Sequence, residues 1–214
     1  MSLAANFYRA ARPEPPRCIG LQLKPYSLGH HITLMSYDSS FARGMSPHFD
    51  DLILSVLVCS MSWSEWNEWR RSWKLPIFLK VWGWLMGKFD LRSAAKTFSE
   101  YISEGCACPE VAVPASGKSL CAAWESRLKL FLVKELRLTH EQAMDYPLSL
   151  AWHEYSAHGE LEGTLTLLSD ADIATQDFLG SEEMQRLVQE ANESGKREVE
   201  EMKKKVYEQP TGAN

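Results

Sequence analysis

The sequence lacks any apolar run long enough to span a membrane. Its most apolar stretches are Leu52–Met61 and Leu75–Gly87, and both fall short of the ~20 apolar residues that a transmembrane helix needs. Lys80 also interrupts the second stretch. Residues 1–17 contain no unbroken apolar run, so a secretory signal is not expected either. These absences predict a cytoplasmic protein without a membrane span.

Paired cysteines and a dominant charge are also missing. The five Cys residues form an odd set without a CxxC pair, which predicts free thiols in a reducing compartment. The net charge of −5 gives the chain no overall attraction to nucleic acid or to anionic lipid. Hydrophobic residues make up 45% of the chain and charged residues 24%, so a core of ordinary size is available. The unusual abundance is aromatic, with eight Trp residues.

Helix start signals recur along the chain. Ser27 precedes an apolar pattern with helical spacing, and Thr139 with Gln142 forms a capping-box pattern. Ser46 is another good N-cap. Residues 52–61 are apolar on nearly every side, which indicates a central buried helix, with a buried strand as the alternative. The predicted helices cover residues 28–38, 47–61, 64–73, 75–104 and 119–136, a segment from 140, residues 147–158, a short segment from 169, and residues 181–208.

The pattern predicts a mainly α fold: a single irregular multi-helix domain with an extended N-terminal arm and a charged C-terminal helix. The arm is predicted over residues 1–25, because its Pro residues remove backbone donors and block helix formation. The helical domain is predicted over residues 26–180. Residues 181–214 form a charged helix and tail with a thin apolar stripe, so this helix should fray or await a partner. Strand is expected in at most one short pair, with Ile19–Leu23 and Glu162–Leu168 as candidates.

One segment resembles a metal-binding motif. Ser46-Pro47-His48-Phe49-Asp50-Asp51 resembles the PHxDD signature of zinc-dependent N-acetylglucosaminyl deacetylases. The resemblance implies that a His and an Asp bind the metal and that the other Asp is the base. That chemistry needs a buried strand before the motif, whereas the preceding residues are polar and small. A capped helix start with an acidic first turn explains the same residues, and the zinc hydrolase is kept as an alternative.

Other motifs fail on spacing. His153 and His158 are five residues apart, so on a helix they point in different directions and cannot act as an HExxH pair. Gly117-Lys118-Ser119 lacks the upstream Gly of a phosphate-binding loop. Cys106 and Cys108 have no second Cys or His pair at a usual metal-site spacing. We therefore expect no catalytic residue, no cofactor and no bound metal.

A tryptophan stripe is the candidate partner-binding site. Trp66, Trp69 and Trp73 fall at i, i+3 and i+7, which is one face of the predicted short helix. Arg70 and Arg71 flank this face. Trp and Arg are the residue types most often found at binding hot spots. We hypothesise that at least one of the three Trp residues is partly exposed and contacts a partner. A core-facing aromatic stripe is the alternative.

The surrounding segment allows another interpretation. Residues 69–89 contain five Lys or Arg residues and no acid. Basic and aromatic residues together are typical of membrane-surface and nucleic-acid-binding segments. A peripheral adaptor that uses residues 70–88 is therefore a further alternative. The acidic total charge favours a solvated edge beside a buried aromatic face, and no nucleic-acid partner is expected.

Two separated stretches carry a family resemblance. The residues are Leu28, Gly29, His30, Leu34, Ser39, Ser40, Phe41, Asp51, Leu52, Ile53, Leu54, Cys59 and Ser60 in the first, and Tyr146, Pro147, Leu148, Ala151, Trp152, Tyr155, Glu160 and Gly163 in the second. Together they resemble proteins of the tail-morphogenesis clusters of tailed phages and prophages. They are most similar to the helical tail assembly chaperones encoded near the tape-measure gene.

This resemblance implies a non-enzymatic binding protein. Such chaperones coat the hydrophobic tape-measure protein and help recruit tail-tube subunits, without a cofactor or catalysis. The implied partners are therefore a tape-measure or tail-tube protein, met in the cytoplasm of the host cell. Exposed aromatic anchors would cover apolar helices of such a partner. The sequence does not indicate an oligomeric state.

Overall fold

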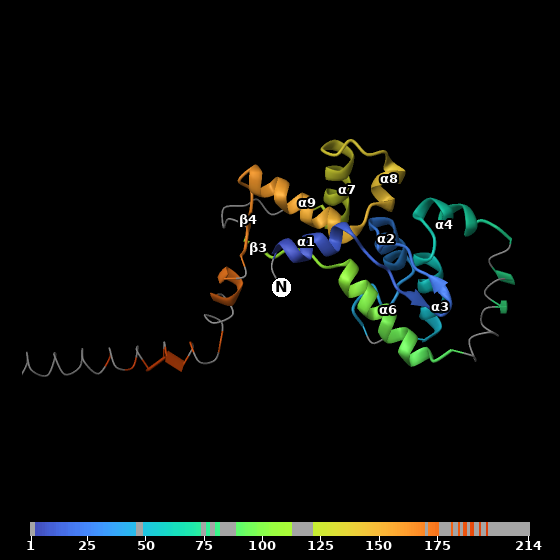
Figure 1. Ribbon diagram of the computed structural model, residues 1–214, viewed down its shortest axis with the longest axis horizontal. Coiled ribbons are helices and arrows are strands. Elements are labelled where there is room, and N and C mark those ends of the chain that lie inside the picture. The colour runs from blue at the N-terminus through green and yellow to red at the C-terminus, as the bar shows by residue number, and fades with distance from the viewer. Residues whose placement is uncertain are drawn as a thin grey trace, which may run out of the picture. The chain divides into compact units, whose positions relative to one another are not determined.

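The computed structural model is mainly helical, as predicted (Figure 1). It describes residues 3–45, 49–73, 76–77, 80–81, 89–112, 122–169 and 171–175, together with residues 181, 184, 186, 187, 189, 190, 193 and 196; the side chains of residues 3–6 and 49–50 are outside this description. Its labelled helices are α1 (Leu3–Ala11), α2 (Leu28–Ser36), α3 (Phe49–Cys59), α4 (Trp63–Trp69), α6 (Leu91–Gly105), α7 (Trp124–Lys134), α8 (His140–Asp145) and α9 (Leu148–Leu161). Among the described residues, no helix combines the length and the apolarity of a membrane span.

The chain divides into two compact units, Met1–Leu167 and Leu168–Asn214. The division falls earlier than the predicted boundary at residue 180. In the second unit, Ser169 caps a helical turn at residues 171–175, because its Oγ accepts a hydrogen bond from the N–H of Asp172 at 3.2 Å. Most of the predicted C-terminal helix lies outside the described residues. Its described residues from 184 to 196 are helical.

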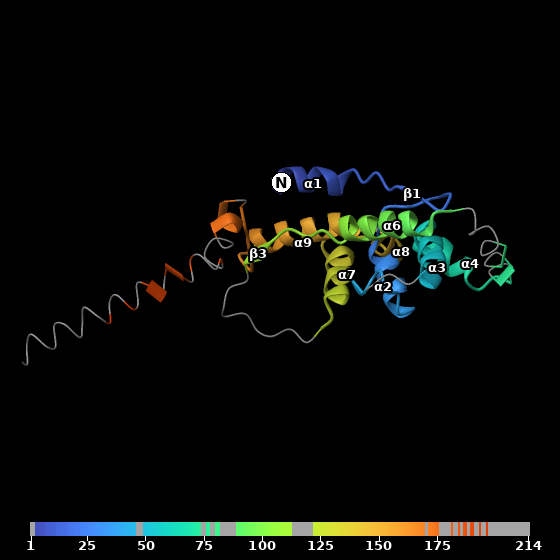
Figure 2. The same ribbon diagram turned by 90° about the horizontal axis from the view of Figure 1, so that it is seen from below.

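The N-terminal arm begins with a helix, which corrects the prediction of an extended arm. α1 ends before Pro13 and packs along α9 (Figure 2). Its sequence, LAANFYRAA, is rich in Ala and contains neither Gly nor Pro, so helix is locally favourable. Residues 13–16 lack regular structure, in agreement with their prolines. A hairpin of β1 (Arg17–Cys18) and β2 (Leu21–Gln22) follows.

α2 and α3 form the centre of the core. Ser27 caps α2 through a capping box: its Oγ accepts from the N–H of His30, and its own N–H donates to His30 Nδ1. The predicted cap of α3, Ser46, lies outside the described residues. The buried residues of α3 are Leu52, Ser55, Val56, Leu57, Val58 and Cys59. This pattern confirms the central buried helix, and the alternative of a buried strand is wrong.

Two helices are shorter than the sequence indicated. The helix predicted over residues 64–73 is α4, which Ser62 caps together with Glu65 and which ends at Trp69. Within the prediction over 75–104, α6 is a separate helix with its own cap, since the Asp90 carboxylate accepts two backbone N–H bonds at 3.1 and 3.2 Å. Residues 74–75, 78–79 and 82–88 of that prediction are outside the described residues.

α7, α8 and α9 complete the core. Thr139 and Gln142 form the predicted capping box at α8. α9 continues through Gly159, where the sequence suggested a break, and the chain reverses only at Gly163, with φ of 66°. A Cβ on Gly159 would lie 2.7 Å from the side chain of Leu165. The first glycine therefore serves close packing, and the second serves the turn.

The strand content exceeds the prediction by one pair. Besides the β1–β2 hairpin, β3 (Val111–Ala112) pairs antiparallel with β4 (Thr166–Leu167). β2 and β4 fall within the two predicted strand candidates. β3 lies between the helices predicted over 75–104 and from 119, where no strand was expected, since a strand of two residues leaves no alternating pattern in the sequence.

Candidate functional site

The predicted tryptophan stripe is divided between core and surface. Trp66 is only 1% exposed and packs on Trp69, with ring centroids 6.2 Å apart. Trp69 is half-buried against the core. Trp73 is 73% exposed, because α4 has ended and the chain has turned before it is reached. The prediction that the three residues share one helical face is therefore wrong.

Trp66 is a core residue and cannot serve as a partner contact. Its ring also meets Tyr37 edge to face at a centroid distance of 6.3 Å. Its Nε1 is buried without a hydrogen-bond partner among the described residues. A buried N–H without an acceptor is costly, so the packing of the ring alone holds this side chain. We remove Trp66 from the candidate partner-binding set.

Arg70, Arg71 and Trp73 of the predicted site are exposed, and exposed apolar residues follow them in the sequence. Arg70 and Arg71 are exposed, and beyond Trp73 the side chains of Ile77 and Val81 are 53% and 54% exposed. We call this set the basic apolar edge: Arg70, Arg71, Trp73, Ile77, Lys80 and Val81. Large exposed apolar side chains grouped with cations are typical of interaction surfaces.

Asp51 has a structural role in the loop between α2 and α3. Its Oδ2 accepts hydrogen bonds from the Ser39 hydroxyl at 2.7 Å, the Ser40 N–H at 2.8 Å and the Ser40 hydroxyl at 2.9 Å. Its Oδ1 accepts from the Ser55 hydroxyl at 2.8 Å. These serines occupy the lone pairs that a metal would need. Asp51 therefore ties the loop to α3, and the sequence held no signal for this role.

The metal-like motifs form no ligand cluster in the described part of the chain. His48 and the side chain of Asp50, from the zinc alternative, lie outside the described residues. His153 meets an aromatic ring of α1 at a centroid distance of 6.0 Å, whereas His158 lies 3.7 Å from Glu135. Among the described residues, no three His, Cys, Asp or Glu side chains are grouped so that they could hold a metal.

The thiols after α6 are poorly suited to reaction. Burial raises the pKa of Cys106 to about 11 and also raises the pKa of Cys108. The thiolate is the reactive form of cysteine, so both residues are held in the less reactive form. The segment that mimics a phosphate-binding loop, Gly117–Ser119, lies outside the described residues.

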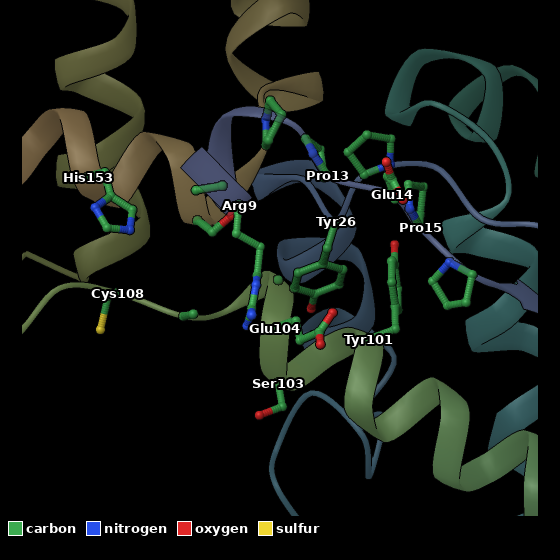
Figure 3. A pocket seen from close by; sticks show the side chains of 17 residues that line it. Arg9, Pro13, Glu14, Pro15, Tyr26, Tyr101, Ser103, Glu104, Cys108 and His153 are labelled. Carbon is green, nitrogen blue, oxygen red and sulfur yellow. The ribbon is translucent and has the colours of Figure 1, made fainter. Parts of the chain in front are cut away.

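A cavity of about 290 Å³ lies between the N-terminal arm and the ends of α6 and α9 (Figure 3). Two hydrogen bonds join the proline segment of the arm to β2 and the residue after it. Gln22 Nε2 donates to the Pro15 carbonyl at 2.7 Å, and the Leu23 N–H donates to the Pro16 carbonyl at 3.2 Å. The prolines that line the cavity are Pro13, Pro15, Pro16, Pro25 and Pro147. Sequence reasoning missed this cavity, since it forms where three distant segments converge.

Tyr26 and Tyr101 present their rings to the cavity and use their hydroxyls elsewhere. The rings meet edge to face with centroids 5.6 Å apart. The Tyr26 hydroxyl lies 3.2 Å from His31 Nδ1, and the Tyr101 hydroxyl donates to the Lys24 carbonyl at 2.8 Å. Burial raises the pKa of both tyrosines. The tyrosines therefore contribute apolar surface and no proton-transfer group.

The rim of the cavity carries charges of both signs. Arg9, Glu14 and Glu104 are exposed around it, with His153 at one side (Figure 3). Burial lowers the pKa of His153, which favours its neutral form. Nucleophilic catalysis requires a nucleophile that is hydrogen-bonded to a base. Among the described residues of the rim, no such hydrogen bond is present. The cavity offers apolar burial inside a rim of mixed charge.

Comparison with known proteins gives no relative. No protein-family model, no curated protein and no solved structure matches the chain. The choice between the two candidate regions therefore rests on their own chemistry. The cavity is already walled by the prolines of the arm, whereas the basic apolar edge leaves large apolar side chains in water. Binding of a partner at the edge would remove this apolar surface from water, so we favour the edge as the binding region.

Proposed function

We propose that this chain is a non-enzymatic protein that binds other proteins during phage tail assembly. The observation that carries the proposal is the basic apolar edge, where Trp73, Ile77 and Val81 each expose more than half of their surface. Full burial of one such side chain contributes ~1.5–3 kcal/mol. A partner that covers the edge would gain this free energy, and apolar surface of this kind marks interaction sites.

The link to tail assembly is supported by the way the two resembling stretches meet. The Leu28 N–H donates to the Tyr146 carbonyl at 3.2 Å, and the Leu148 N–H donates to the Tyr26 carbonyl at 2.8 Å. Leu28, Leu148 and Ala151 are buried in the same core. The two stretches are far apart in the sequence but form one packed unit. If the resemblance reflects a common helical core, the resembling residues should pack together, as these two stretches do.

Trp73 is the proposed anchor of the interface. A tryptophan buries up to ~250 Å², and an interface Trp cut to Ala usually costs ~2 kcal/mol or more of binding. Ile77 and Val81 are one helical turn apart and extend the apolar contact. Arg70 and Arg71 supply charged donors beside it. The proposed partners are a tape-measure or tail-tube protein, and binding them requires no cofactor.

Co-expression tests the proposal. The full chain is produced with the tape-measure and tail-tube proteins of the same phage or prophage, and we expect one of them to become more soluble and to co-purify. Trp73→Ala should weaken the complex by ~30-fold, which corresponds to ~2 kcal/mol, without changing the melting temperature. Tyr8→Ala is the matched control, because Tyr8 is 70% exposed on α1, outside the edge. Absence of a complex with either protein, or equal weakening by the control, would contradict the proposal.

A further inference from the structure

We infer that the partner segment bound by the basic apolar edge is an acidic amphipathic helix. The inference rests on the proposed function, since it names the chemistry of the same partner. Five of the 23 cationic residues lie in residues 69–89, which contain none of the 28 acidic residues; the rest of the chain therefore has 18 cations against 28 acids, a net charge of −10. The edge itself holds three of these cations, Arg70, Arg71 and Lys80, and no acid, on a chain of negative net charge.

This distribution of charge indicates that the partner segment is acidic. Complementary potentials steer association and suppress wrong partners, since like charges brought together are unfavourable. An acidic segment is repelled by most of the protein and attracted to the edge. A basic segment is attracted elsewhere and repelled at the edge. The apolar residues would supply most of the affinity, and the charges would decide where and in what register the partner docks.

The spacing of the residues within the edge indicates that the partner segment is a helix. Ile77, Lys80 and Val81 are each helical and exposed, and their sequence spacing of i, i+3 and i+4 is that of residues on one face of a helix. The ammonium group of Lys80 is thus part of an apolar face. A partner helix with apolar residues at the same spacing covers the two aliphatic side chains. A carboxylate beside its apolar stripe then meets Lys80.

A flat anionic membrane fits this edge less well than a helix. Glu65 and Glu68 on α4 and Asp90 before α6 are exposed and flank the edge in the sequence. A bilayer is an extended plane and would face these acids together with the cations, within a screening length of ~10 Å at ordinary salt. A single helix is only ~10 Å wide and can follow the edge without covering the acids. The observations therefore favour a protein helix.

A matched pair of synthetic peptides tests the inference. Both carry the same helical stripe of Leu and Ile, and one has Glu where the other has Lys. Binding to the full chain is measured by fluorescence anisotropy at about 25 mM and about 300 mM salt. We expect the Glu peptide to bind at least ~10-fold more tightly than the Lys peptide, and its affinity to fall ~10-fold at the higher salt, because rim charges act through screened attraction.

Charge reversal identifies the surface. The double variant Arg70→Glu, Arg71→Glu should lose the preference for the Glu peptide by ~10-fold or more. The matched control is Arg12→Glu, Arg17→Glu, which changes the same charge at exposed arginines outside the edge. The control should bind as the natural chain does. Equal binding of the two peptides, or an equal loss in the control, would overturn the inference.

Three further outcomes separate this inference from neighbouring possibilities. Vesicles with about a third phosphatidylglycerol replace the peptides in a sedimentation assay. Binding to these vesicles that is lost in the edge variant, without a peptide preference, would overturn the inference in favour of a lipid surface. A tail partner that co-purifies without any charge preference also overturns it but leaves the proposed function in place. A clear charge preference with no tail partner supports the inference and contradicts the function.

Discussion

Trp66 and Trp73 are seven residues apart, but replacing Trp66 by Ala should destabilise the protein strongly, whereas replacing Trp73 by Ala should leave its stability nearly unchanged. Trp66 is 1% exposed and packs against the rings of Tyr37 and Trp69. Large-to-small changes of this kind cost ~3–5 kcal/mol, because both transfer free energy and packing are lost. Trp73 is 73% exposed. Removing it should change the free energy of unfolding by less than ~0.5 kcal/mol, as is usual for surface positions.

The expected shifts are large enough to be read from melting curves. In a protein of this size each kcal/mol corresponds to about 2–4 °C in melting temperature. Trp66→Ala should therefore lower the melting temperature by roughly 6–20 °C, and Trp73→Ala by less than about 2 °C. Trp66→Phe should recover most of the loss. It keeps a buried ring, and the indole Nε1 that it removes has no partner among the described residues.

Circular dichroism at a helical wavelength follows both thermal and urea unfolding of each variant. The two methods together show whether a shift reflects stability or a change in the unfolding mechanism. A melting temperature for Trp66→Ala within about 2 °C of the unaltered protein would refute the placement of this residue in the core. A loss in Trp73→Ala as large as that in Trp66→Ala would refute the division of the stripe.

Three further changes test the core around α2 and α3. Asp51→Ala should lower the free energy of unfolding by ~2–4 kcal/mol in urea titrations, because three serines lose a charged acceptor; a loss below ~1 kcal/mol would contradict this role. Stability should fall as pH drops below about 6.5, because burial lowers the pKa values of His30, His31 and His153 and the unfolded chain then binds the extra protons; each histidine contributes at most ~1.4 kcal/mol per pH unit. His30→Gln should reduce the slope of this fall, and an unchanged slope in that variant would count against the role of His30. Gly29→Ala should cost ~1–3 kcal/mol, because its Cβ would lie 2.6 Å from the Trp63 ring, so a gain in stability from the better helix former would refute this contact.

Local signals made much of the fold predictable from the sequence. The capping residues Ser27 and Thr139 start helices where expected, since a cap depends only on the residues of the first turn. The buried α3 was likewise evident from its continuous apolar run. The N-terminal helix α1 was not predicted, because the conformation of the whole arm was inferred from its prolines, which begin only at Pro13. Proline restricts its own neighbourhood and not residues several positions before it.

The candidate site was predictable only in part. The spacing of Trp66 and Trp73 gives a shared face only if the helix continues between them, and α4 ends at Trp69. Arg70 and Arg71 follow the end of α4 and are exposed, but which Trp faces water depends on tertiary packing. The cavity beneath the arm and the serine partners of Asp51 depend on contacts between distant segments, which spacing in the sequence does not encode.

Hydrogen–deuterium exchange of the full chain locates the partner most directly. The chain is measured alone and when saturated with the tail protein that co-purifies with it, so that the basic apolar edge and the arm cavity are read together. We predict slower exchange in the peptides that cover residues 70–81 and unchanged exchange in those that cover Tyr26 and Tyr101. Slower exchange at the two tyrosines, with none at residues 70–81, would contradict the assignment of the edge as the binding surface.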